Sequence, residues 1–151
     1  MNVDGSHSMA RGAAGCGVVL RDANGGWIEG FTYNIGHCSI GEAEAWGVLQ
    51  GLLMASRHGI SNLIVESDSK PGQHNSVLNR CIAAVGSFCQ VLSTHAYREQ
   101  NRIADAMAKR ALLGSSGLML WSNLPGGLSE MLHEDNIGAK FIRRTPTTGV
   151  C

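Results

Sequence analysis

The chain has 151 residues, which fits one domain and is too short for two domains of ordinary size. Lys plus Arg and Asp plus Glu number 12 each, so the formal net charge is zero, which excludes a protein that holds nucleic acid by bulk positive charge alone. Hydrophobic residues make up 44% of the chain and charged residues 16%, so a disordered chain is excluded and a packed globule is indicated.

The sequence carries no membrane or export signal. No stretch approaches the roughly 20 apolar residues that a membrane-spanning helix needs. Residues 1–12 have neither the basic nor the apolar region of a signal peptide. The five cysteines form neither a C-x-x-C pair nor a zinc-finger spacing, and their odd number indicates reduced thiols. We therefore expect an intracellular protein that is not secreted; these features do not distinguish nucleus from cytoplasm.

The chain is expected to open with an antiparallel meander of three strands. Asp4-Gly5-Ser6 is a turn signature, so the first strand is predicted to end at Asp4 and to be short. Asn24-Gly25 tolerates positive φ at both turn positions and predicts a tight hairpin between the second and third strands. The predicted strands cover residues 1–4, 16–20 and 27–33.

Parallel strands with crossover helices are expected in the next part of the chain. Apolar residues at helical spacing predict a first helix that stops at Gly59. The second helix can begin only after Pro71-Gly72, so this crossover is expected to be shortened, with about three helical turns. Asn101 is expected to cap the last helix. The predicted elements are a helix over 41–58, a strand over 63–68, a helix over 76–85, a strand over 89–95 and a helix after residue 101.

This order predicts an α/β fold, a mixed sheet of three antiparallel strands followed by parallel strands, with helices on both faces. We assign residues 1–113 to this domain. Residues 114–151 are interrupted by Gly and Pro clusters and are expected to form a loosely packed or partly disordered tail, with a brief helix over 130–134. The basic cluster of this tail consists of Lys140, Arg143 and Arg144.

Four acidic residues fall at strand ends or helix starts of this pattern: Asp4, Glu44, Asp68 and Asp105. Each has an ordinary explanation, such as an Asx turn or a favourable interaction with a helix dipole. Together they are expected to converge at one edge of the sheet, where their mutual repulsion requires cations. Hard divalent ions such as Mg²⁺ prefer oxygen ligands, and two of them can activate a water in phosphodiester hydrolysis.

Five sequence stretches carry a family resemblance. NVDGS, AGCGVVLRDANGGWIEGF, IGHCSIGEAEAWGVLQGL, VESDS and HAYREQNRIADAMAKRAL occur in this order within residues 1–113. On these stretches the chain resembles the ribonuclease H type 1 domain family, closest to its plant, reverse-transcriptase-like group, which is related to retroelements. The resemblance implies a ribonuclease H-like fold and two metal ions, Mg²⁺ or Mn²⁺, bound with substrate. The metal ligands that it implies are Asp4, Glu44, Asp68 and Asp105.

Two neighbouring acids fit the family motifs less well. Glu42 lacks the relation to Trp46 that Glu44 has in the family motif, and Asp68 ends its strand whereas Glu66 lies within it.

His95 is a further candidate catalytic residue. Its spacing to Asn101 and Asp105 matches the spacing in the family. The resemblance implies a role for His95 in proton shuttling or product release, for which an imidazole pKa near 7 is suitable. A strand-end histidine bonded to its loop is the ordinary alternative.

The function that the resemblance implies is endonucleolytic hydrolysis of the RNA strand of RNA–DNA hybrids, selected through 2′-OH contacts. A chain with no net charge and no basic protrusion is expected to bind the hybrid weakly and in a salt-dependent way. The alternative is a catalytically silent, ribonuclease H-like nucleic-acid-binding module, which the short first strand and shortened crossover favour; the four acids and His95 favour the enzyme. A dinucleotide-binding enzyme is a weaker third candidate, because Gly15-x-Gly17 lacks the third glycine and opens a strand.

Overall fold

The structure, a computed structural model, describes residues 1–142 and the side chains of residues 1–137. Its centre is a six-stranded sheet with the strand order β5-β4-β1-β2-β3-β6. The strands are β1 (Asn2–Ser8), β2 (Ala13–Arg21), β3 (Trp27–Gly36), β4 (Asn62–Ser67), β5 (Gln90–His95) and β6 (Gly117–Trp121). The helices are α1 (Ile40–Arg57), α2 (Pro71–Val85), the 3-10 turn η1 (Arg98–Gln100), α3 (Arg102–Leu113) and α4 (Ser129–Ile142).

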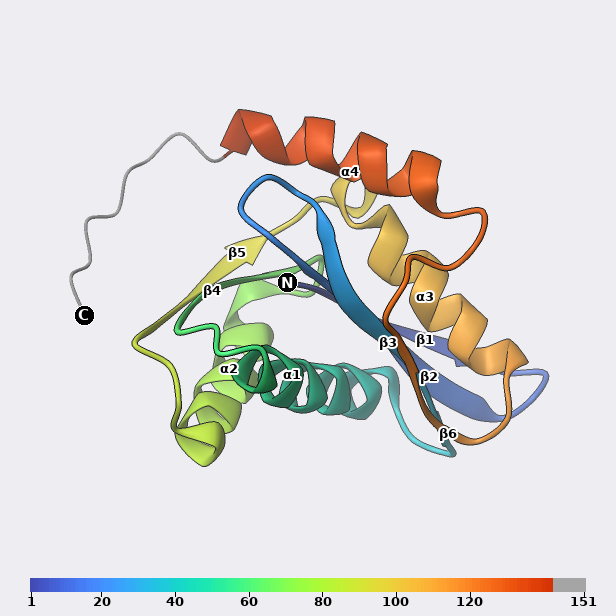
Figure 1. Ribbon diagram of the computed structural model, residues 1–151. Helices are drawn as coiled ribbons and strands as arrows, with labels where there is room; N and C mark the ends of the chain where they lie inside the picture. Colours follow the sequence, from blue (N-terminus) through green and yellow to red (C-terminus); the bar gives the residue numbers. More distant parts are fainter. Residues whose placement is uncertain (143–151) are drawn as a thin grey trace.

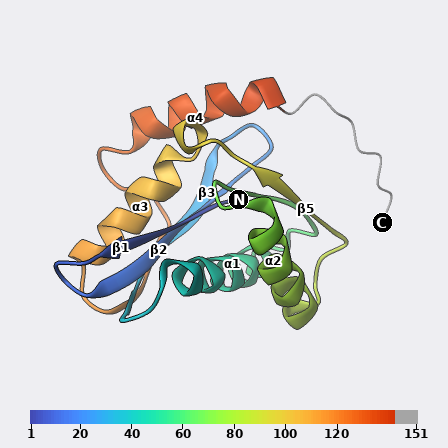
Figure 2. The same ribbon diagram turned by 180° about the vertical axis from the view of Figure 1, so that it is seen from behind.

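Helices cover both faces of the sheet. α1 and α2 lie on one side, and α3 lies on the other side with α4 beside it (Figures 1 and 2). β1, β2 and β3 pair antiparallel in chain order, whereas β4 pairs parallel with both β1 and β5. The predicted mixed α/β sheet is therefore confirmed. Among residues 1–142, none of the helices combines the length and the apolar character needed to cross a bilayer.

The first strand is longer than predicted. β1 runs to Ser8 and pairs with β2 along its whole length, so Asp4-Gly5-Ser6 is not a turn. The glycine serves a different purpose. A Cβ on Gly5 would lie 2.8 Å from Cγ of Glu44 and 3.2 Å from the carbonyl oxygen of Ile40. Gly5 therefore allows the first turn of α1 to approach β1 closely.

α1 matches its prediction, and its start is defined by a capping box. The Ser39 hydroxyl accepts from the Glu42 amide at 3.2 Å, while the Glu42 carboxylate accepts from the Ser39 amide at 2.7 Å. Gly59, at φ +68°, follows the end of the helix. Val48 and Leu52 of α1 are fully buried and pack in the core between this helix and the sheet.

The second crossover is not shortened as predicted. α2 has 15 residues and begins at Pro71, because a proline at the first helical position removes only an N–H that no helical carbonyl could accept. The helix is, however, shallowly packed. His74 and Leu78 are its two buried residues, and most of its other positions are exposed or half-buried.

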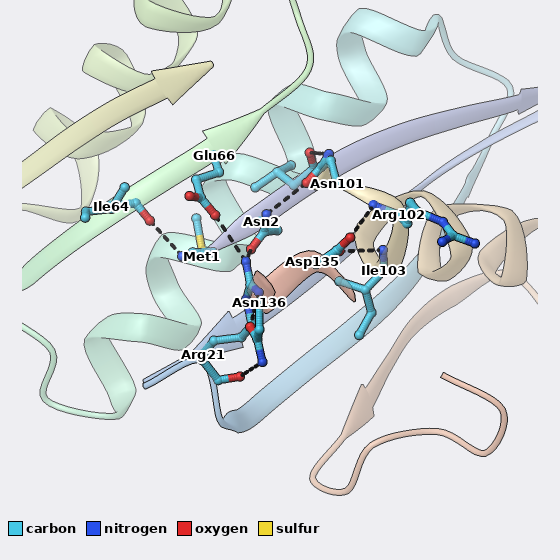
Figure 3. A network of polar contacts seen from close by, with 12 residues as sticks. Met1, Asn2, Arg21, Ile64, Glu66, Asn101, Arg102, Ile103, Asp135 and Asn136 are labelled. Atoms are coloured by element: carbon cyan, nitrogen blue, oxygen red, sulfur yellow. Dashed lines mark hydrogen bonds and ion pairs between the residues drawn. The ribbon is translucent and has the colours of Figure 1, made fainter. Parts of the chain in front are cut away.

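α3 packs directly on β2 at Gly17, where a Cβ would lie 2.3 Å from the Ala108 amide nitrogen. Asn101 stands at the N-cap position, but the prediction that its side chain caps the helix is wrong. The carboxylate of Asp135 in α4 accepts instead from the amides of Arg102 and Ile103, at 3.3 and 3.0 Å (Figure 3). α4 thus caps α3 from a distant part of the chain.

The described part of the tail is packed, in contrast to the expectation of a loose segment. β6 pairs with β3, and α4 extends well beyond the predicted helix over 130–134. Leu128 is buried in a second apolar cluster with Val19, Ile103 and Met107, between α3 and the sheet. Of the predicted basic cluster, Arg143 and Arg144 lie outside the described residues, as does the side chain of Lys140. The boundary after residue 113 stays a prediction.

We expect α2 to open more readily than the strand that precedes it. Amide hydrogens over residues 76–85 should exchange faster than those over residues 63–66, since α2 buries few side chains whereas β4 is bonded on both sides within the sheet. Hydrogen exchange followed by mass spectrometry of the metal-free chain tests this difference. Equal protection of both segments would show that α2 is as firmly held as the sheet.

Candidate functional site

Three carboxylates meet at one edge of the sheet. Asp4 belongs to β1, Glu44 to the second turn of α1, and Asp68 directly follows β4. One oxygen from each carboxylate lies within 4.8 Å of the others. The sheet register explains the pair on the strands. Asn2 lies opposite Glu66 in the parallel pair, so Asp4 and Asp68, two residues further along, also lie at one level.

Asp4 has the most strongly perturbed carboxyl group of the site. The residue is 7% exposed. Burial raises the pKa of Asp4 to about 7, and the negative charges of Asp68 and Asp105 contribute in the same direction. The Gly5 amide, which donates to Asp4 Oδ1 at 2.8 Å, opposes the shift only in part. The metal-free site therefore holds a proton near neutral pH to relieve its excess negative charge.

Glu44 is perturbed in the same direction. Burial raises the pKa of Glu44, and the charge of Asp68 raises it further, against the hydrogen bond from Ser69. The Ser69 hydroxyl donates to Glu44 Oε2 at 2.6 Å and fixes the orientation of this carboxylate. A crowded set of carboxylate oxygens, of which Asp4 is buried and Glu44 and Asp68 are half-buried, fits a hard divalent cation. Asp4, Glu44 and Asp68 are the residues that could hold it.

Asp105 lies beside this group but does not belong to it. It sits in the first turn of α3, near enough to raise the pKa of Asp4. Its carboxylate accepts from Lys109 Nζ at 2.6 Å, one helical turn away. The structure thus brings three of the four predicted acids together, with Asp105 at the margin and paired with Lys109.

The two competing acids point elsewhere. Glu42 is exposed and its carboxylate is engaged in the capping box with Ser39. Glu66 forms an ion pair with the buried guanidinium of Arg21, 3.2 Å away. The choice of Glu44 over Glu42 and of Asp68 over Glu66 therefore agrees with the geometry of the site.

His95 lies at the end of β5, exposed to solvent. Its Nδ1 is 3.3 Å from the carbonyl oxygen of Ser69, and its ring meets the Tyr97 ring edge-on at 5.6 Å between centroids. Ser69 thus links two predicted site residues, because its hydroxyl binds Glu44 and its carbonyl binds His95. The role of His95 stays a prediction.

Sequence reasoning missed three residues that contact the predicted site: Ser69, Arg98 and Lys109. Lys109 could have been found, because it stands four residues after Asp105 in a predicted helix. Arg98 Nε lies 3.6 Å from Asp68 Oδ2, a contact that depends on the turn η1 and has no signal in local sequence. Ser69 follows Asp68 directly, but only the folded chain shows that its hydroxyl reaches α1.

Known proteins are similar to this chain over most of its length. The family model described as "Reverse transcriptase-like" matches residues 2–111. A protein of Arabidopsis thaliana, named "Putative ribonuclease H protein", is 36% identical over 156 aligned residues, which include 95% of this chain and 25% of that protein. The chain therefore spans about a quarter of the length of this curated relative.

Solved structures share the fold. A ribonuclease H1 from Halobacterium salinarum has a TM-score of 0.65 at 24% identity, covering 76% of this chain and 96% of that chain. The N-terminal ribonuclease H domain of a Mycobacterium tuberculosis protein has a TM-score of 0.62 at 23% identity, with coverages of 73% and 89%. A ribonuclease H1 named LC11, in complex with an RNA/DNA hybrid, has the same TM-score and identity, with coverages of 73% and 93%. These likenesses confirm the predicted ribonuclease H-like fold.

The raised pKa of Asp4 predicts a stability change with pH. The folded chain keeps the Asp4 proton up to about pH 7, whereas the unfolded chain loses it near its ordinary pKa of 3.8. The contribution of this group to the free energy of unfolding is therefore largest at low pH and is lost as the pH rises toward 7. Asp4→Asn cannot ionise at this position. The free energy of unfolding of the variant, measured relative to the parent, should therefore rise by about 2–4 kcal/mol from pH 4.5 to pH 7.5.

Urea unfolding of the metal-free proteins at both pH values measures this gain. Glu99→Gln, which removes an exposed carboxylate, should differ from the parent equally at both pH values. If Asp4→Asn and the parent change in parallel, Asp4 does not carry a raised pKa.

Proposed function

The chain belongs to the reverse transcriptase-like family, and from this membership we propose that it hydrolyses the RNA strand of RNA–DNA hybrids endonucleolytically. The observation that carries the proposal is the meeting of Asp4, Glu44 and Asp68 carboxylate oxygens within 4.8 Å at one sheet edge. The choice of substrate is supported by the similar ribonuclease H1 whose structure contains an RNA/DNA hybrid. The match covers about a quarter of the curated relative. The proposed activity therefore concerns the residues of this chain and not the other parts of that longer protein.

We assign the binding of two divalent ions, Mg²⁺ or Mn²⁺, to this acidic group. Asp4, Glu44 and Asp68 would hold them, with Asp105 contributing from the first turn of α3. Such ions, when bound with substrate, activate a water and stabilise the leaving oxygen. Asp4 must release its proton before it can serve as a ligand, since its pKa is raised to about 7. Binding is therefore favoured above neutral pH.

His95 is proposed to carry a proton during the reaction. The Ser69 carbonyl can only accept a hydrogen bond, so Nδ1 of His95 bears the hydrogen in this contact. Nε2 is then the nitrogen with a free lone pair, on a ring that is exposed at the edge of the site. It can accept the proton that the attacking water loses, and the imidazolium can then give that proton to the leaving oxygen or to solvent.

Binding of the hybrid is proposed to be weak and strongly dependent on salt, because the chain has no net charge with which to attract a polyanion. Selection of RNA over DNA would depend on contacts to the 2′-OH groups in the wide minor groove. If the protein binds the hybrid but does not cleave it in the presence of Mg²⁺, the alternative function, a catalytically silent nucleic-acid-binding module, is favoured.

Asp68→Asn should abolish cleavage of a labelled RNA–DNA hybrid while leaving the fold intact. The substitution removes a charge that the metal ions need, and it relieves repulsion with Glu44 and Asp4 in the metal-free protein. Cleavage assays with Mg²⁺ or with a chelator, run beside thermal unfolding, measure both effects. A variant that cuts as fast as the parent would show that Asp68 is not a ligand.

Two acids of α1 provide a matched pair. Glu44→Gln should reduce cleavage by about a hundredfold or more, whereas Glu42→Gln should retain parental cleavage, because the Glu42 carboxylate faces Ser39 and not the site. Glu42→Gln also keeps an amide oxygen that can replace the carboxylate in the capping box. Equal losses in both variants would contradict the placement of Glu44 in the site.

A further inference from the structure

Arg21 is a buried charge that ties three separate elements together. Its side chain is 2% exposed, and its guanidinium donates to Asn2 of β1, to Glu66 of β4 at 3.2 Å and to Asn136 of α4 at 2.6 Å (Figure 3). Because a buried cation is costly without partners, these acceptors hold the three elements at fixed positions around it. Nothing in the proposed reaction uses Arg21 itself.

The network extends to α3 by two routes. Asn2 donates through Nδ2 to Asn101 Oδ1 at 3.0 Å, and Asn101 donates to the Val3 carbonyl at 3.1 Å. The second route runs along α4, where Asp135 directly precedes Asn136, the acceptor of Arg21. Asp135 is fully buried and accepts from the Arg102 and Ile103 amides. The start of α3 is thus held between β1 and α4 (Figure 3).

Three elements of this network, β1, β4 and α3, each lead to a predicted site acid a short distance further along the chain. Asp4 follows Asn2, and Asp68 follows Glu66, by two residues, which is about 7 Å along an extended chain. Asp105 lies in the first helical turn, whose leading amides Asp135 caps. The backbone between each anchor and its acid is mostly strand or helix, so a shift of the anchors displaces the carboxylates.

We propose that α4 is part of the scaffold of the acidic site and that Asp135 is a positioning residue, which fixes Asp105 relative to Asp4 and Asp68. The proposal rests on the proposed function, because it assigns these acids to metal binding. It implies that the functional domain extends through α4 and does not end at residue 113.

The test uses Asp135→Ala and compares it with two control variants. Leu132→Ala removes an apolar contact of α4 but leaves the hydrogen bonds of Asp135 and Asn136 in place. Glu134→Gln removes a neighbouring, exposed carboxylate that pairs with Arg102. Thermal unfolding identifies the temperature at which all variants are folded, and all further measurements are made there.

We expect Asp135→Ala to weaken Mn²⁺ binding to the free protein by about tenfold, measured by electron paramagnetic resonance of unbound Mn²⁺. In hybrid cleavage, kcat should fall by a similar factor while KM changes by less than about twofold, because Asp135 is fully buried and cannot contact the substrate. Asp135→Asn retains one oxygen that can accept from an α3 amide and should recover part of both losses. Glu134→Gln and Leu132→Ala should retain parental Mn²⁺ affinity.

Two outcomes would overturn the inference. One is a folded Asp135→Ala variant with parental Mn²⁺ affinity and kcat. The other is an equal loss in Leu132→Ala, which would attribute the effect to the stability of α4 alone. Asp68→Asn in the same Mn²⁺ assay separates this inference from the proposed function. If Asp68→Asn binds Mn²⁺ as the parent does, the acidic group is not the metal site; if it loses binding and Asp135→Ala does not, only the positioning role fails.

Discussion

Repulsion among Asp4, Glu44 and Asp68 is the constraint around which this part of the structure is built. Their oxygens lie within 4.8 Å of one another, and burial strengthens the repulsion by removing water. The chain keeps them together by placing two of them on neighbouring parallel strands and the third on a helix that packs against β1. Partial protonation of Asp4 relieves the remaining charge in the metal-free protein.

The close approach of α1 to β1 has a particular sequence basis. Gly5 has no side chain to separate Asp4 from Glu44, and the capping box at Ser39 sets where the helix begins. The same box occupies the carboxylate of Glu42, so two acids two residues apart on one helix have different surroundings. Local chemistry at the helix start therefore determines which of them faces the other acids.

Much of the central fold could be predicted from sequence because its signals are local. Asn24-Gly25 marked the β2–β3 hairpin, although the predicted tight turn with positive φ at both positions is wrong: the connection covers residues 22–26, and of this pair Gly25 alone has a positive φ. The apolar spacing of α1 predicted its length and its buried face. The meeting of Asp4 and Asp68 followed from the order of strands and crossovers. Their roles as ligands, and that of His95, stay predictions.

The sequence predictions were wrong where the structure depends on contacts between residues far apart in the chain. The Asp-Gly-Ser sequence resembles a turn, but β1 continues because β2 is available as a partner over its whole length. β6 is a five-residue run between glycine-rich segments, and its pairing with β3 has no local signal. Asp135 reads as one acid among several in a short helix, yet it caps a helix more than thirty residues before it.

That distant cap has a consequence for the order in which the domain can be completed. During synthesis, the segment with Arg21 and the start of α3 leaves the ribosome before Asp135 and Asn136 do. Until α4 arrives, a guanidinium destined for the interior lacks one of its acceptors, and the first amides of α3 lack theirs. Contacts that span most of the chain close late and slowly, because the loop-closure entropy must be overcome before they form. A nascent chain that already contains every acid of the site is therefore not yet a chain that holds them in place.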